Sequence, residues 1–402
     1  MPWKICNLMD ARLGFVEDYE RGGVSLAELC RRHGISRKTG YKWLERHRLG
    51  GLEGLADQSR RPRHSPHRTS EEVERAVIRV RKEHPVWGGR KIRAVLKQEG
   101  LEESLLPAAS TITGILRRHD LLGEGMREGA KSWQRFSRSE PNDLWQMDFK
   151  GHFGMDGGRR CHPLTVLDDH SRYNLVLQAC ATETRREVQG HLVRAFRRYG
   201  LPREILCDWG SPWGKPSPIR GQDPPTPRME VWLNRLGVRV VHGRPSHPQT
   251  QGKEERFHRT LSVEVLRREE LWRDLAHCQR AFEKWSRVYN QKRPHEALGM
   301  QTPSSCYELS ARSYPEHLPD PESFYLEDDE LRRVKSKGEL TFRGQFYSVG
   351  SAYVGELLAL RPLEEGRWEV YHCWRSLGVI DQTGPKQPKS RYQRLKPPLG
   401  KV

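Results

Sequence analysis

Residues His247–Leu261 read His-Pro-Gln-Thr-Gln-Gly-Lys-Glu-Glu-Arg-Phe-His-Arg-Thr-Leu. The first half has the proline, glutamine and glycine of a loop, and the second half has the pattern of an amphipathic basic helix. Glu254 and Glu255 stand where the loop becomes the helix. A soluble core rarely needs two carboxylates there, whereas a site that holds a divalent cation against a phosphate chain does. From this stretch alone, either glutamate can be the ligand.

Two further acids are placed to join that site. Leu144–Lys150 alternates as a strand does and contains Asp148, and Glu204–Asp208 is a short apolar strand that ends in Asp208. Functional groups gather where parallel strands end, so these acids can converge with a glutamate of the loop–helix junction. Three carboxylates suit Mg²⁺, and two such ions about 4 Å apart can assist an in-line displacement at phosphorus. The alternative for Asp148 is a solvent-facing position on its strand.

Three motifs carry a family resemblance: Trp145–Gly151, Cys207–Trp213 and His247–Leu261, in that order. Together with Leu29–Trp43 and Pro85–Ile92, they resemble bacterial insertion-sequence DDE transposases with a retroviral-integrase-type catalytic core. The resemblance covers roughly residues 20–310 and implies a ribonuclease-H-like core fold.

The resemblance also implies the catalytic and metal-binding acids. The family's triad corresponds to Asp148, Asp208 and Glu255, because the family's glutamate directly precedes Arg-Phe-His. Glu254 then fills a variable position, and we expect it to face solvent.

The reaction that the resemblance implies is Mg²⁺-dependent cleavage at the ends of an element, followed by attack of the freed 3′-hydroxyl on target DNA. Two ions are expected, with Mn²⁺ as a substitute. The expected partners are double-stranded DNA, both element ends and target, and further copies of the chain, at least a dimer. Residues around the loop and helix are predicted to hold DNA near the metals: Gln249, Gln251, Lys253, Arg256, His258 and Arg259. A solvated basic helix face is the alternative.

The chain departs from the family at its second acid, where Asp208-Trp209-Gly210 replaces the usual Asp-Asn-Gly. The indole of Trp209 can stack on a base or crowd the metal site. The second outcome favours another function, a catalytically impaired, transposase-derived DNA-binding protein. A ribonuclease-H-like nuclease without strand transfer is a third possibility, but tandem sequence-specific DNA-binding units argue against it.

The N-terminal residues predict a helix-turn-helix. Ser25 and Ser36 are placed as N-caps of two helices that flank the turn at Gly34. The second helix exposes Arg37, Lys38, Thr39 and Lys42 to a major groove, while Trp43 packs inward. A helical hairpin without a ligand is the alternative.

The whole chain is predicted to be multidomain, with all-α helix-turn-helix units, an α/β ribonuclease-H-like integrase core of order β-β-β-α-β-α-β-α, and a small β-barrel. Ser110 is expected to cap the last helix of the second helical unit. The predicted boundaries are 1–50 for the helix-turn-helix, 51–69 for a basic linker, 70–122 for the second helix-turn-helix-like unit, 123–141 for a linker, 142–315 for the core, 320–384 for the barrel and 385–402 for a disordered tail.

Composition agrees with a polyanion partner. Lys and Arg number 70 against 52 Asp and Glu among 402 residues, a net charge of +18, and the excess lies in the first two thirds of the chain. The alternative is a merely soluble basic protein. The eight cysteines form no C-x-x-C pair, which argues against a zinc ribbon and a disulfide framework. The sequence has neither a membrane span nor a signal-peptide core, so a cytoplasmic, nucleoid-associated bacterial protein is expected.

Overall fold

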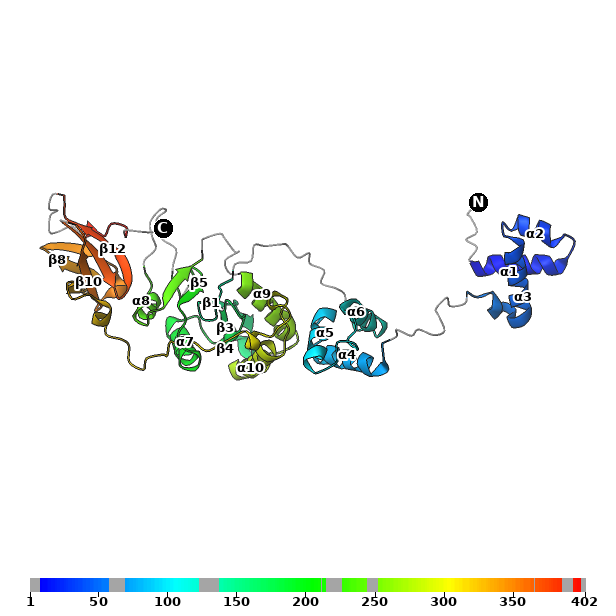
Figure 1. Cartoon of the computed structure of the whole chain (residues 1–402), viewed down its shortest axis with the longest axis horizontal. Helices are drawn as coiled ribbons and strands as arrows, with labels where there is room; N and C mark the ends of the chain where they lie inside the picture. Colours follow the sequence, from blue (N-terminus) through cyan, green and yellow to red (C-terminus); the bar gives the residue numbers. More distant parts are fainter. Residues whose placement is uncertain are drawn as a thin grey trace. The chain divides into compact units, whose positions relative to one another are not determined.

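The structure, a computed structural model, forms two compact units, Met1–Arg68 and Thr69–Val402 (Figure 1). The second helical unit, predicted as a domain of its own, shares one unit with the core. No helix in the described part of the chain combines the length and apolarity needed to cross a bilayer. The residues described are 8–57, 69–122, 137–210, 212–214, 226–243, 252–364, 366–384 and 393–398. Most of the two predicted linkers therefore lies outside them.

The first unit is the predicted helix-turn-helix, with a short 3-10 turn after its last helix. The caps are confirmed, because Ser25 Oγ accepts a hydrogen bond from the backbone of Glu28 and Ser36 Oγ from that of Thr39. Six buried side chains form the core, to which each helix and the 3-10 turn contribute: Phe15, Val16, Leu29, Cys30, Trp43 and Leu55. The helices are α1 (Leu8–Arg21), α2 (Leu26–Arg32) and α3 (Arg37–Gly50).

The second helical unit is attached to the core through a partly buried glutamate. Trp87, which is 1% exposed, donates its Nε1 hydrogen to Glu264 over 3.2 Å, and Trp285 of the core donates to the same carboxylate over 2.8 Å. The predicted cap at Ser110 is wrong, because the last helix of the unit already begins at Ala109 and has no side-chain cap. The helices are α4 (Glu71–Glu83), α5 (Gly89–Gln98) and α6 (Ala109–Arg118).

The core sheet mixes antiparallel and parallel strands, as predicted. Its order is β4-β3-β1-β5-β6, with β2 added to β3; β1 is antiparallel to β3 and parallel to β5, and β5 is parallel to β6. The predicted mixed α/β core is confirmed. The strands are β1 (Leu144–Phe149), β2 (Phe153–Gly154), β3 (Arg160–Asp168), β4 (Asn174–Cys180), β5 (Glu204–Cys207) and β6 (Arg239–His242).

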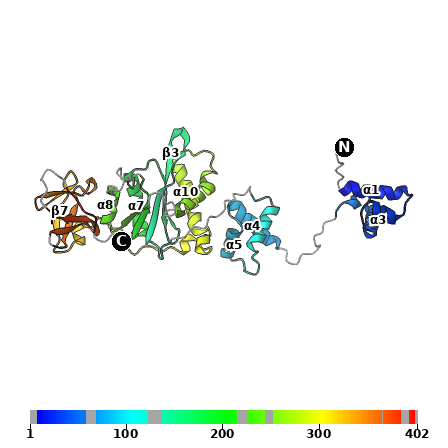
Figure 2. The same ribbon diagram turned by 90° about the horizontal axis from the view of Figure 1, so that it is seen from above.

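Helices cover both faces of this sheet. Figure 2 shows α7 and α8 on one side of the strands and α10 on the other. The predicted helix from Lys253 to Arg268 ends its α-helical part at Leu261 and continues as a π-helical turn, Ser262–Leu266. The helices are α7 (Arg185–Tyr199), α8 (Arg228–Arg235), α9 (Gly252–Leu261) and α10 (Leu275–Gln291).

The free edge of β4 is protected by side chains of α10. Asn290 accepts from the backbone N–H of Asn174 over 2.8 Å and donates to its carbonyl over 2.9 Å. Gln279 accepts from the backbone of Ala179 over 2.9 Å. These amides satisfy strand groups that an open sheet edge leaves unpaired.

The C-terminal domain consists of two small packed sheets. Their orders are β12-β11-β10-β7 and β13-β9-β8, around one shared apolar core. The predicted disordered tail is wrong for residues 393–398, because Gln393 pairs with Tyr347 and Lys396 bridges to Val379. The strands are β7 (Glu330–Arg333), β8 (Glu339–Phe342), β9 (Gln345–Ser348), β10 (Leu357–Pro362), β11 (Arg367–His372), β12 (Arg375–Asp381) and β13 (Gln393–Arg394).

Helix α8 joins this domain to the core sheet. Val231 of α8 lies in the core of the C-terminal domain, and Trp374 donates its Nε1 hydrogen to the carbonyl of Asn234 over 3.0 Å. Arg375 forms an ion pair with the buried Glu230. The C-terminal domain is therefore packed against the core rather than tethered to it.

Candidate active site

The register of two parallel strands brings two of the predicted acids together. Gln146 on β1 pairs with Leu206 on β5, so Asp148 and Asp208, each two residues further on, are opposite one another. Trp145 and Met147 point into the core beneath α7. Because side chains alternate along a strand, Asp148 points to the opposite face, where α9 lies. The solvent-facing alternative for Asp148 is wrong.

The surroundings of Asp148 disfavour its charged form. Burial and the neighbouring charge of Asp208 raise the pKa of Asp148 to about 7, with smaller contributions from the charges of Glu183 and Glu255. All three other acids therefore lie close enough to act on this carboxylate electrostatically. A carboxyl group with a raised pKa beside other acids, at the end of parallel strands, is typical of a functional site.

The two glutamates at the start of α9 lie on different faces of the helix. Glu254 shares the sheet-facing stripe with Phe257 and Leu261, which follow it by three and seven residues, and all three are buried. Glu255, about 100° further round the helix, is exposed at the rim of the site. The expectation that Glu254 faces solvent is wrong, since its exposure is 0%. The spacing to Phe257 and Leu261 is the sequence signal that predicts this burial.

Glu254 and the backbone of Asp148 meet at the hydroxyl of Thr165. Thr165 on β3 is the cross-strand partner of Asp148, and its hydroxyl lies 3.0 Å from Glu254 Oε2 and 2.8 Å from His258 Nε2. Burial and the charge of Asp148 hold the pKa of Glu254 well above its usual range. Among the described residues, Oε1 of Glu254 has no hydrogen-bond partner.

Two of the predicted DNA-binding residues of α9 point inward. Lys253 forms an ion pair with Asp169, whose side chain is fully buried, and also donates to its carbonyl over 3.0 Å. Burial lowers the pKa of Lys253 to about 8 and, together with the charge of Lys150, that of His258 to about 3. These contacts fix the start of α9 on the sheet.

The other predicted residues divide into exposed and undescribed ones. Arg256 and Arg259 are exposed on α9. Gln249 and Gln251 lie outside the described residues. Contact of any of these residues with DNA stays a prediction.

Trp209, which follows the second acid, is held by an aromatic contact. Its indole stacks on His242 of β6, with ring centroids 4.0 Å apart and planes at 19°. His242 Nδ1 lies 3.0 Å from the carbonyl oxygen of Asp208, and Nε2 lies 3.6 Å from Glu230. The ring is thus held against β6, and Asp208 Oδ1 accepts a hydrogen bond from the Gly210 backbone over 2.9 Å.

The oxygen donors of this site fit a hard divalent cation such as Mg²⁺. Asp148, Asp208 and the two glutamates supply only carboxylates, and Glu254 Oε1 is a buried acceptor without a partner among the described residues. The ligand atoms of the predicted triad do not all lie within 4.8 Å of one another. A single ion therefore does not reach all three in this arrangement.

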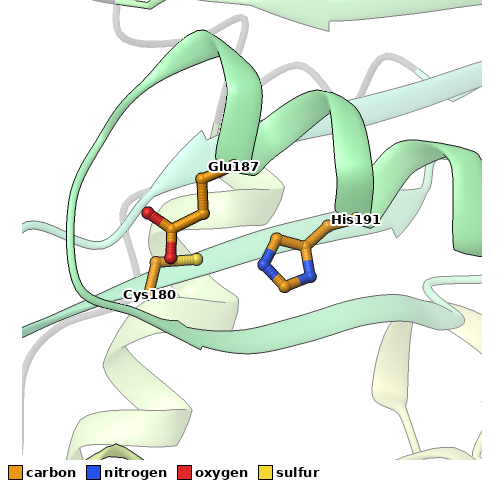
Figure 3. A group of neighbouring side chains, drawn as sticks. All are labelled: Cys180, Glu187 and His191. Carbon is orange, nitrogen blue, oxygen red and sulfur yellow. The ribbon is translucent and has the colours of Figure 1, made fainter.

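One group in the described part of the chain does meet that distance: Cys180, Glu187 and His191, drawn in Figure 3. Its carboxylate already accepts hydrogen bonds from the Ala181 and Thr182 backbones, each 3.1 Å long. Arg194 donates to Nδ1 of His191, which places a cation where a metal-binding histidine usually has an acceptor. These contacts describe a helix-start hydrogen-bond cluster.

The predicted recognition helix presents its basic residues outward. Arg37, Lys38 and Lys42 of α3 are exposed, and Thr39 is partly exposed because its hydroxyl lies 2.9 Å from that of Ser36. Trp43 is 8% exposed, as predicted. The ammonium group of Lys42 lies 4.6 Å from the centre of its ring.

Comparison with known families agrees with this division of the chain. The matching models are described as Helix-turn-helix domain (residues 11–63), Homeodomain-like domain (39–116), Integrase core domain (138–248 and, by a second model, 236–303) and IS481 family transposase, C-terminal domain (329–387). The chain has the domains of an insertion-sequence DDE transposase. The C-terminal strands therefore match a domain known from transposases of the IS481 family.

Individual relatives of this transposase are also insertion-element proteins. The 31.7 kDa protein of insertion element IS407 from Burkholderia multivorans is 24% identical over 60% of this chain and 82% of its own length. The 39.2 kDa protein of insertion element IS476 from Xanthomonas euvesicatoria is 24% identical over 70% and 78%. Among solved structures, the HTLV-2 integrase catalytic core domain in complex with magnesium is 16% identical, with a TM-score of 0.31, over 42% of this chain and 99% of that one.

Proposed function

We propose that this transposase binds the ends of its element, cleaves them at their 3′ ends and joins them to target DNA. Asp148, Asp208 and Glu255 hold the metal in this proposal. The observation that carries it is that Asp148 and Asp208 lie side by side at the ends of β1 and β5, where Asp208 and Glu255 both raise the pKa of Asp148. Since three acids too far apart for one ion can serve two, we propose two Mg²⁺ ions, with Mn²⁺ as a substitute.

The bound ions supply Lewis acidity at the attacking and leaving oxygens. The chain itself fixes the acids: β1 and β5 hold Asp148 and Asp208 side by side, and the Lys253–Asp169 ion pair sets the start of α9. Exposed cations of α3 and α9 hold the DNA backbone. We propose at least a dimer, since two ends must be brought together, and a cytoplasmic, nucleoid-associated location.

The test is a joining assay with purified protein and the DNA that flanks its gene. Asp148→Asn and Glu255→Gln are expected to abolish Mg²⁺-dependent strand transfer while end binding stays within about twofold, since neither side chain lies on α3. Asp156→Asn, on an exposed turn of the same domain, is the matched control and joins as the wild type does. Undiminished joining by either triad variant would remove these acids from the reaction.

The alternative, a catalytically impaired DNA-binding protein, rested on Trp209. Because the indole stacks on His242 of β6, we expect it to leave Asp208 free to bind the metal. In the same assay, an impaired protein binds ends and joins none with either Mg²⁺ or Mn²⁺. That result for the wild type would replace the proposed function by this one.

A further inference from the structure

Glu254 occupies a helix position that normally carries an apolar side chain. It continues the stripe of Phe257 and Leu261 on α9 and is fully buried against β1 and β3. A carboxylate in such a place is unfavourable unless other groups compensate its charge and its hydrogen-bond acceptors. We therefore ask which groups around Glu254 compensate its carboxylate.

The protein compensates one oxygen of this carboxylate. Nε2 of His258 lies 2.8 Å from Thr165 Oγ1, and that hydroxyl lies 3.0 Å from Glu254 Oε2. When the histidine N–H donates to the hydroxyl, the one hydroxyl hydrogen is shared between Glu254 Oε2 and the backbone carbonyl oxygen of Asp148, each 3.0 Å away. This chain orients Glu254 but satisfies only Oε2.

The second oxygen is left without a protein donor. Oε1 is buried and has no partner among the described residues, and the charged group that acts on Glu254 is another carboxylate, Asp148. Two carboxylates that act on each other in this way are neutralised either by a proton, which accounts for their raised pKa values, or by a bound cation. A hard divalent cation is the ligand whose chemistry matches oxygen donors of this kind.

We propose that Glu254 is a fourth carboxylate of the metal centre, and that its Oε1 binds the same divalent cation as Asp148. The proposal rests on the proposed function, because it takes the cation at Asp148 from there. Glu254 then binds from beneath, within the protein, and Glu255 binds from the solvent-exposed rim.

The test measures Mn²⁺ binding to the full-length protein by electron paramagnetic resonance and calorimetry, without DNA. Glu254→Gln, which keeps the shape and the acceptor for Thr165, is expected to weaken Mn²⁺ binding at least tenfold. Glu254→Asp keeps a carboxylate and is expected to stay within about threefold of the wild type. Glu270→Gln removes an exposed negative charge further along the same segment and controls for net charge.

Thermal unfolding in EDTA separates a lost ligand from a lost fold. Glu254→Gln is expected to unfold at or above the wild-type temperature, because a buried negative charge has been removed. Glu254→Leu restores the apolar stripe and serves as a second variant that folds; it is expected to lose Mn²⁺ affinity to the same extent.

The outcomes distinguish this inference from the proposed function. Wild-type Mn²⁺ affinity in Glu254→Gln or Glu254→Leu, together with loss of affinity in Asp148→Asn and Glu255→Gln, overturns the inference and leaves the triad standing. Wild-type affinity in Asp148→Asn overturns both, since no cation then lies at Asp148. Parallel losses in the variants of Asp148, Glu254 and Glu255 support a four-carboxylate centre.

Discussion

Helices α3 and α9 have similar basic sequences but present them in different ways. On α3, Arg37, Lys38 and Lys42 are all exposed, and the helix is buried through Gly40 and Trp43. On α9, Lys253 and His258 turn inward to Asp169 and Thr165. The basic residues of α3 therefore lie on the protein surface, whereas Lys253 and His258 of α9 contact residues of the core.

The partner of each helix explains the difference. Helix α3 is part of a small helical unit, in which a narrow stripe is enough to close the core. Helix α9 lies on a sheet with α10 beside it, so a wider face is buried, including Glu254, Phe257 and Leu261. The number of basic residues therefore indicates a nucleic-acid-binding helix only if the buried face is narrow enough to leave those residues exposed.

The largest expected effect comes from breaking the inward ion pair. Lys253→Met leaves the buried carboxylate of Asp169 without its cation, and removal of one partner of a buried pair typically costs about 3 kcal/mol or more. Chemical unfolding of the purified protein measures the loss. Lys42→Met on α3 is the matched control, with a change below about 0.5 kcal/mol. If Lys253→Met is as stable as the wild type but binds DNA more weakly, Lys253 acts as a DNA-binding residue on the surface, like Lys42.

His258 predicts a pH effect of intermediate size. Its pKa in the folded protein is about 3 because burial and the charge of Lys150 disfavour the cation, whereas the unfolded value is about 6.5. Between these values the unfolded state binds the extra proton, so stability falls as pH falls below about 6.5. From pH 7 to 5, the wild type is expected to lose about 2 kcal/mol more than His258→Gln.

The difference in stability between the wild type and His258→Gln isolates the contribution of His258, because other titrating groups, including Glu254 and Lys150, are present in both proteins. Unfolding free energies at several pH values, measured in EDTA, give both slopes. Equal slopes would mean that His258 is protonated in the folded state and accessible, as on a DNA-facing helix.

The sequence predicts the acids of the site better than it predicts their surroundings. Alternation in Leu144–Lys150 and the apolar run before Asp208 placed both aspartates correctly, because these signals are local. The partner of Lys253 is 84 positions away along the chain, and that of Trp209 is on another strand. No local pattern encodes either contact, so the inward turn of Lys253 and the position of the indole could not be predicted.

The family register and the burial pattern of α9 carry different information. The register of Arg-Phe-His indicates Glu255, which is exposed on α9. The apolar spacing from Glu254 to Phe257 and Leu261 was equally visible in the sequence. It was overlooked because a glutamate is normally assigned to solvent, although periodicity is the stronger signal.

The smallest expected effect concerns the basic residues that point outward on α3 and α9. Lys42 on α3 is exposed, and if it neutralises one phosphate, Lys42→Ala reduces the slope of log K against log salt for end binding by about one. Arg256→Ala is the corresponding change on α9. Fluorescence anisotropy with end DNA over a range of salt concentrations measures both slopes. An unchanged slope for Arg256→Ala beside a reduced one for Lys42→Ala would show that α9 takes no part in end binding and that its basic sequence mainly fixes the helix on the sheet.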